Sequence, residues 1–76
     1  MRRYLYLLRV QSFMTQEAMA SAMNITRQGY QLLENGSIKN MKLQYIIDLS
    51  KFLNIDIEAL VRMEVRYINS HGGYVC

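Results

Sequence analysis

The sequence contains no proline and only four glycines, so few of its residues would interrupt a helix. Three of the glycines lie at or after position 36, and Gly29 is the exception. The alternation of apolar and polar residues that marks a strand is also almost missing, and its one weak example runs from Glu64 to Ile68. These absences favour long helices joined by short turns, which predicts an all-α fold.

Cysteine is nearly absent, because Cys76 is the only one in the chain. A single cysteine can form neither an internal disulfide nor a structural zinc site. An exposed thiol suits a reducing compartment, so we expect a cytoplasmic protein. No apolar run is long enough to cross a bilayer. The start "MRRYLYLLRV" is similar to a signal peptide, but Arg9 interrupts its apolar run and no cleavage site follows, so no membrane association is expected.

The residue sets that carry catalysis or bind metals are missing too. The only histidine, His71, lies in a glycine-rich tail, and no Ser/His/Asp or Cys/His set accompanies it. The chain has no glycine-rich phosphate loop, and four of its acidic residues show no ligand spacing: Asp48, Asp56, Glu58 and Glu64. The sequence therefore predicts no enzyme, no metal, no cofactor and no small-molecule ligand.

The chain is instead rich in apolar residues and slightly basic. Its 76 residues fit one small domain, and 51% of them are hydrophobic, including six Met and six Tyr. This content exceeds what one small core needs, and the surplus could serve a dimer interface. The net charge of +3 is compatible with binding a polyanion but does not establish it.

Apolar periodicity predicts five helices, at about residues 2–11, from 15 onward, at 27–34, at 43–53 and from 56 onward. Thr15 and Thr26 are good N-caps for the second and third helices. Gly36 can take the left-handed conformation that ends the third helix. The fourth helix has an inward face made of Leu43, Ile46, Ile47, Leu49, Phe52 and Leu53. Five methionines are expected to fill the core: Met14, Met19, Met23, Met41 and Met63.

Two segments together resemble the helix-turn-helix domain of the Cro/CI phage-repressor type. They are "TQEAMASAMNITRQGYQLLENG", which starts at Thr15, and "LQYIIDLSKFLNIDIEAL", which starts at Leu43. Each match alone is weak, but their joint spacing is specific, and the resemblance covers about residues 4 to 61. It implies a five-helix, lambda-repressor-like domain at residues 1–61 that binds double-stranded DNA, followed by a C-terminal extension at 62–76.

Three departures from the family pattern concern the loops and the third helix. Phe13 stands where this family often has glycine, and Tyr30 stands where an aliphatic residue is usual. The loop after Gly36 lacks the proline often found there. These differences bear on local loop geometry rather than on the fold.

The outward face of the third helix presents candidate base-reading residues. Arginine can bond the two acceptors of guanine, and glutamine can pair with adenine. Recognition helices use their N-terminal residues for such contacts. The predicted base contacts are Arg27, Gln28, Gln31 and Leu32. The alternative is an ordinary solvated face, and for Leu32 it is a leucine covered by neighbours or by a dimer partner.

Residues around this helix are candidates for phosphate contacts. Gln16 lies at the start of the second helix, where main-chain N–H groups attract an anion. Asn35, Lys39 and Lys42 follow the third helix in the segment that contacts the DNA backbone in the resembling family. In related repressors the position of Lys42 can reach toward the minor groove. Each lysine could instead be a free surface charge.

Two further positions take their interpretation from the resemblance. Arg9 and Glu34 match positions that the fold brings together in a partly buried ion pair, although they could be unrelated surface charges. Gly29 lies near the start of the third helix, where a side chain would meet the second helix or a phosphate. We expect glycine there to allow close approach of the backbone, with drift at a tolerant site as the alternative.

These observations predict a sequence-specific transcriptional regulator, a repressor from a bacterium or phage. The alternative is a protein-binding module of the same fold, such as an antitoxin-like protein or one that binds a phage or host factor. A homodimer is expected through the C-terminal segment, where Val61, Val65, Tyr67 and Ile68 fit either an extended helix or a short strand. Otherwise this segment folds back on its own monomer and covers Tyr6 and Leu7.

Overall fold

Five α-helices form the fold in the computed structural model, which describes residues 1–70. They are α1 (Arg3–Gln11), α2 (Gln16–Ala22), α3 (Arg27–Asn35), α4 (Leu43–Leu53) and α5 (Ile57–Ser70). No strand occurs among the described residues, and the predicted all-α, five-helix fold is confirmed. The predictions about His71 and Cys76 lie outside residues 1–70.

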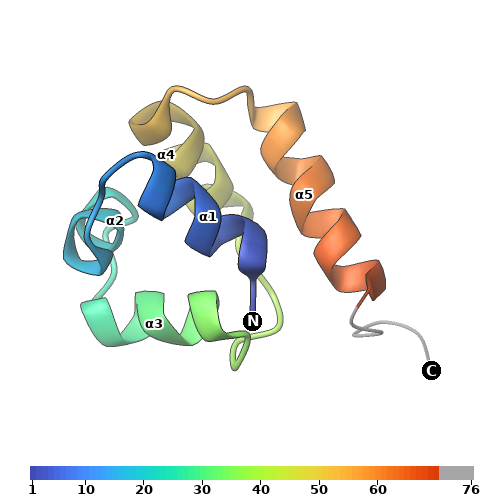
Figure 1. Cartoon of the computed structure of the whole chain (residues 1–76), viewed down its shortest axis with the longest axis horizontal. Helices are drawn as coiled ribbons and strands as arrows, with labels where there is room; N and C mark the ends of the chain where they lie inside the picture. The colour runs from blue at the N-terminus through green and yellow to red at the C-terminus, as the bar shows by residue number, and fades with distance from the viewer. Residues whose placement is uncertain (71–76) are drawn as a thin grey trace.

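Capping residues set the starts of the two central helices. The Thr15 hydroxyl accepts a hydrogen bond from the Ala18 N–H at 3.0 Å, and the Thr26 hydroxyl accepts one from the Gly29 N–H at 3.0 Å. Each bond satisfies a donor that the first helical turn leaves unpaired. Because α2 and α3 are joined by this short capped turn, they form a helix-turn-helix unit, with α3 along one edge of the molecule (Figure 1).

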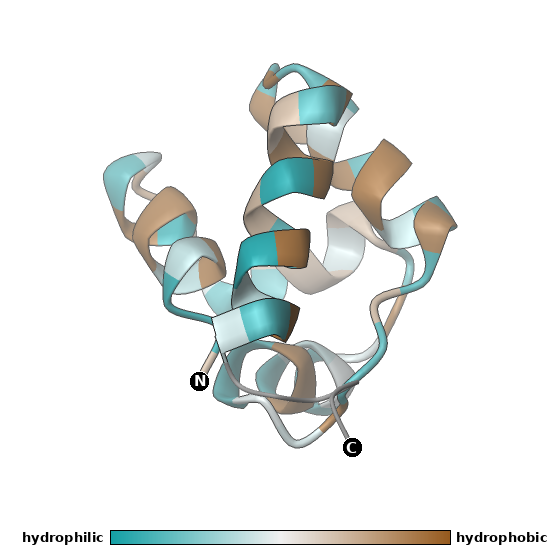
Figure 2. Cartoon of the chain, turned by 90° about the vertical axis from the view of Figure 1, so that its right-hand side faces the viewer, coloured by the Kyte–Doolittle hydropathy of each residue, from teal (hydrophilic) through white to brown (hydrophobic). Residues whose placement is uncertain are grey.

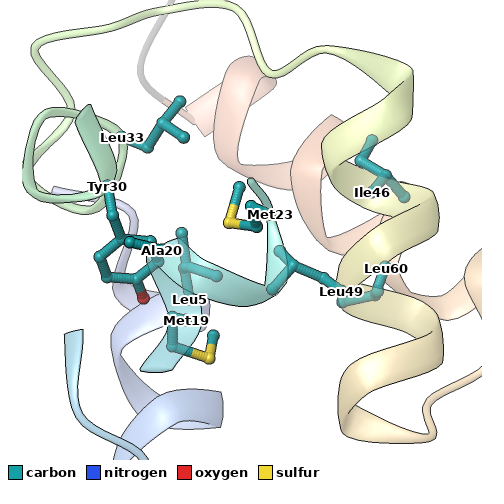
Figure 3. Close-up of a cluster of buried hydrophobic side chains, with 9 residues drawn as sticks. All are labelled: Leu5, Met19, Ala20, Met23, Tyr30, Leu33, Ile46, Leu49 and Leu60. Atoms are coloured by element: carbon teal, nitrogen blue, oxygen red, sulfur yellow. The ribbon is translucent and has the colours of Figure 1, made fainter. Parts of the chain in front are cut away.

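The core forms where all five helices meet. Figure 3 shows its nine buried hydrophobic residues: Leu5, Met19, Ala20, Met23, Tyr30, Leu33, Ile46, Leu49 and Leu60. Met23 lies between side chains of α3 and α4 (Figure 3). Of the five methionines predicted to fill the core, Met19 and Met23 belong to this cluster. The other three pack against it: Met14, Met41 and Met63. Two sequence expectations are wrong, because Leu43 is 64% exposed and Phe52 is 40% exposed, so the inward face of α4 is narrower than its apolar pattern suggested.

Helix α5 is continuous to Ser70, so the short strand considered for Glu64 to Ile68 does not form. Helical spacing places Leu60 and Glu64 on the same face, and both are buried. Tyr6 and Leu7 are 37% and 39% exposed, so the described part of the C-terminal segment does not cover them. The boundary drawn at residue 61 falls within this uninterrupted helix, and the division of the chain there stays a prediction.

A buried arginine connects the start of the chain to α5. The side chain of Arg2 is fully buried, and its Nε lies 3.0 Å from Oε1 of Glu64. The hydroxyl of Tyr4 donates to the same carboxylate at 2.6 Å, and the ring of Tyr67 lies 4.8 Å from the Arg2 guanidinium carbon. No local pattern in the sequence predicts this cluster.

Four of the described residues, all near helix ends, take the left-handed conformation: Phe13, Asn24, Gly36 and Asn54. Gly36 has φ = 90°, a conformation that favours glycine, and a Cβ added there would lie 2.8 Å from the Tyr67 hydroxyl oxygen, which would have to shift. Phe13 has φ = 58°, at the position where the resembling family often has glycine. A large residue in this conformation is unfavourable, and Phe13 is also 95% exposed.

We expect stability to fall in alkaline solution because the buried phenol of Tyr30 and the partly buried phenol of Tyr4 must stay neutral. Burial raises the pKa of Tyr4 and of Tyr30, and the carboxylates of Glu64 and Glu34, respectively, raise them further. Folding therefore favours the protonated phenols, and this stabilisation is fully present below about pH 10 and lost as the pH rises through the folded pKa. Urea unfolding from about pH 9 to about pH 11 measures the loss. Tyr4→Phe should flatten the pH dependence, and an equally steep decline in that variant would contradict this origin.

Candidate nucleic-acid interface

Helix α3 divides its residues between the core and solvent. Tyr30, Leu33 and Glu34 are buried on one side. The side chains predicted to read bases lie on the other side, where Arg27, Gln28 and Leu32 are exposed and Gln31 is partly buried. At about 100° per residue these positions share one face of the helix. Thr26, just before the helix, is also exposed, and its hydroxyl caps the helix as its residue type predicted.

A hydrogen-bonded chain of three side chains joins α2 to α3. The Gln31 side-chain amide donates to Oε1 of Gln16 at 3.0 Å, and the Gln16 amide donates to Oε2 of Glu34 at 2.8 Å. This series of hydrogen bonds starts from the buried Glu34 carboxylate and ends at the exposed face of α3. It therefore fixes the orientation of two amides that were predicted separately as a phosphate contact and a base contact. The sequence spacing did not indicate that they touch each other.

Glu34 is the hub of this network. Its Oε1 lies 2.9 Å from Nε of Arg9 and also accepts the Tyr30 hydroxyl at 3.2 Å. The ion pair between Arg9 and Glu34 is thus present in the structure, with both side chains largely buried. The hydrogen bond to Glu34 raises the pKa of Arg9. This hub anchors α1 to α3 beneath the candidate interface.

Arg27 lies at the start of α3 with its side chain 58% exposed. Its Nη1 is 3.4 Å from Oε1 of Glu17, whose side chain is 72% exposed. An exposed pair of this kind contributes little to stability, so Arg27 can exchange Glu17 for another partner at small cost. An open depression of about 500 Å³ lies beside it, lined by Arg9, Met14, Thr15, Gln16, Glu17 and Arg27.

The loop after α3 holds the remaining candidates for phosphate contacts. Lys39 and Lys42 are exposed there, and Nζ of Lys42 lies 5.7 Å from the centre of the Tyr45 ring. Asn35 is exposed at the end of α3, where its Oδ1 accepts the Ser37 N–H at 2.8 Å. Asn35 therefore stabilises the turn after α3 in addition to any contact with DNA.

The structure gives Gly29 a different environment from the one expected. A Cβ added at Gly29 would lie 3.3 Å from Oγ1 of Thr26 and 3.9 Å from Cβ of Ile25. The nearest atoms thus belong to the capping residue and the preceding turn rather than to α2. A side chain at Gly29 would require the Thr26 hydroxyl to shift by a few tenths of an ångström.

These features define a helix-turn-helix domain with a polar, partly basic recognition face. The model of a helix-turn-helix family (HTH_3) matches residues 5–60, and the chain belongs to this XRE-type family. The family is one of DNA-binding regulatory domains. No curated protein and no solved structure matches the chain significantly. Within residues 1–70, no helix is long and apolar enough to span a membrane.

Proposed function

We propose that this protein is a sequence-specific transcriptional regulator that represses by reading the major groove of double-stranded DNA with α3. The observation that carries the proposal is the ordered Gln16–Gln31 pair beside the exposed Arg27 and Gln28. A helix whose first residues expose hydrogen-bonding side chains, with the Gln31 amide one turn further along already oriented, suits base-edge contacts. The protein would act in the cytoplasm of a bacterium, on host or phage genes.

The proposed contacts fall into two groups. Arg27, Gln28, Gln31 and Leu32 face the base edges, with Leu32 against a thymine methyl group. Gln16, Asn35, Lys39 and Lys42 flank them and contact phosphates, which positions the helix without reading sequence. Selecting bound duplexes from a random pool tests the proposal. A recovered consensus whose binding weakens steeply with salt supports it, and the absence of salt-sensitive duplex binding overturns it.

Arg27→Ala is expected to weaken binding to the selected duplex by roughly 1–3 kcal/mol and to relax one base-pair position. The reason is that a bidentate contact to guanine is lost while the phosphate contacts remain. Titrating parent and variant against single-base variants of the duplex measures both effects. Arg62→Ala is the matched control, because Arg62 is also exposed and paired with a glutamate, Glu58, but lies on α5. If Arg27→Ala kept the full preference at every position, Arg27 would not read a base.

We further propose a symmetric homodimer that places two α3 helices on half-sites about 34 Å apart. In this proposal, residues 1–61 form the DNA-binding domain, and the exposed side of α5 with the segment to residue 76 contributes to dimerisation. Ile57, Val61 and Val65 recur every fourth residue on α5 and are 36–48% exposed. Figure 2 views the molecule from the α5 side, where hydrophobic residues recur along the helix. A two-fold axis could bury this stripe against its copy.

A protein-binding module of the same fold is the second candidate. One observation favours it: α1 and the turn after it expose four large apolar side chains, Tyr6, Leu7, Val10 and Phe13. Exposed apolar side chains that are close together in the sequence of one helix and its following turn can serve as a protein-binding surface. If the protein shows no salt-dependent binding to any duplex, this second function becomes the better explanation.

A further inference from the structure

The buried guanidinium of Arg2 uses all of its hydrogen-bond donors. Two of them meet the Glu64 carboxylate, at 3.0 Å from Nε and 3.0 Å from Nη2. The other three meet main-chain carbonyls, with Nη1 donating to Leu33 at 2.7 Å and to Ile38 at 2.6 Å, and Nη2 donating to Lys39 at 2.7 Å. An arginine has five such N–H groups in a rigid plane, so this arrangement leaves none unused.

The three carbonyls show what this arginine organises. One belongs to the last turn of α3, and two belong to the loop that joins α3 to α4. The main-chain N–H of Arg2 also donates to the Glu34 carbonyl at 2.7 Å, so the start of the chain lies against the end of α3. Figure 1 shows the N-terminus beside this loop. Arg2 therefore holds the loop backbone from its inner side, while Lys39 and Lys42 are exposed to solvent.

Stability alone does not explain this arrangement. A buried ion pair is often no more stabilising than a pair of apolar side chains of similar volume. Apolar residues, however, could not bond the carbonyls of Ile38 and Lys39. The loop would then have to become ordered during binding, and such ordering lowers affinity.

We propose that Arg2 is a positioning residue for phosphate binding: it holds the α3–α4 loop in the conformation that presents Lys39 and Lys42 to the DNA backbone. The proposal rests on the proposed DNA-binding function. Arg2 is fully buried and cannot touch DNA itself, so it acts only through the loop. Glu64 supports it from α5 by fixing the plane of the guanidinium.

Arg2→Lys is the primary test, because it keeps the charge that faces Glu64 and loses the planar set of donors. We expect the affinity for the selected duplex and for a random duplex to fall by the same factor, about tenfold. The slope of log K against log salt between 50 and 200 mM should become shallower by about 1–2, because each phosphate contact contributes about 0.9. Backbone amides at 37–41 should exchange faster with solvent in the free variant.

Three further variants separate positioning from folding and from charge. Arg3→Lys is the matched control, since Arg3 is the exposed neighbour, and it should change none of these readouts. Arg2→Met/Glu64→Leu removes both charges, keeps the net charge and is expected to fold, yet it should show the same shallower slope. Adding Arg2→Lys to Lys39→Gln/Lys42→Gln should reduce the slope no further, because the two changes act on the same contacts.

Several outcomes would overturn the proposal. One is an unchanged slope of log K against log salt in both Arg2→Lys and Arg2→Met/Glu64→Leu. Another is a larger loss of affinity for the selected duplex than for the random duplex, because that would mean that Arg2 affects base readout. Failure of both variants to fold would assign Arg2 to stability. If the parent protein binds no duplex, it is the proposed DNA-binding function that fails. Faster amide hydrogen exchange at residues 37–41 in Arg2→Lys would then show only that Arg2 orders the loop.

Discussion

Replacing Glu34 with alanine is expected to lower the free energy of unfolding by about 3–5 kcal/mol, because it leaves the largely buried guanidinium of Arg9 without its carboxylate. The same change removes the acceptors of the Tyr30 hydroxyl and the Gln16 amide. A domain of this size has a total stability on the order of 4–11 kcal/mol. The variant should therefore lose a large share of its stability, which urea unfolding at neutral pH can measure.

Glu17→Ala is the matched control for this experiment. It removes the same charge from a glutamate that is 72% exposed and pairs only weakly with Arg27, so its effect should stay within about 0.5 kcal/mol. A loss below about 1 kcal/mol for Glu34→Ala would mean that water replaces the carboxylate around Arg9. The ion pair would then not be a structural hub.

Local patterns were sufficient to predict most of the backbone. The caps at Thr15, Thr26 and Gly36 act within one helical turn, so their residue types predicted where α2 and α3 begin and where α3 ends. Helical spacing likewise assigned Ile46 and Leu49 to the inward face of α4, and both are buried. Spacing was less reliable for Leu43 and Phe52, because α4 has more apolar residues than its neighbours can cover.

The contacts that sequence reasoning missed join residues far apart in the chain. Arg2 meets Leu33, Ile38, Lys39 and Glu64, and its separation of 31–62 positions from them leaves no local pattern. An arginine before the first helix is usually exposed, and only the packed fold reveals that this one is buried. The resemblance did indicate the contact between Arg9 and Glu34, because it supplied a spatial relation that spacing alone could not.

The same limit applies to the candidate interface. The outward face of α3 followed from 100° steps around the helix, whereas the bond between Gln16 and Gln31 depends on how α2 crosses α3. This bond changes the interpretation of both residues. They are one oriented unit linked to Glu34 rather than two independent contacts, so substituting either one should affect the other.

The proposed dimer predicts the largest effect on DNA binding. Val61→Gln/Val65→Gln should leave the monomer fold intact, because both valines are on the exposed side of α5 and glutamine favours a helix. Because a symmetric dimer contains each substitution once in each subunit, four glutamines would take the place of four valines in the interface. We expect a monomer in sedimentation experiments and roughly 100-fold or greater weakening on a two-half-site duplex, as the advantage of linked binding is lost. Neither substitution changes the net charge, so the salt dependence of binding to a single half-site should be unchanged.

Val10→Gln is the matched control, because it replaces a valine of similar exposure on α1. It should leave both the mass in solution and the duplex affinity unchanged. If Val10→Gln produced the monomer and the α5 variant did not, the interface would lie on the apolar patch of α1 instead. A parent protein that sediments as a monomer at tens of micromolar and binds two-half-site and one-half-site duplexes equally well would eliminate the dimer. The base contacts of a single α3 would then have to supply all of the specificity.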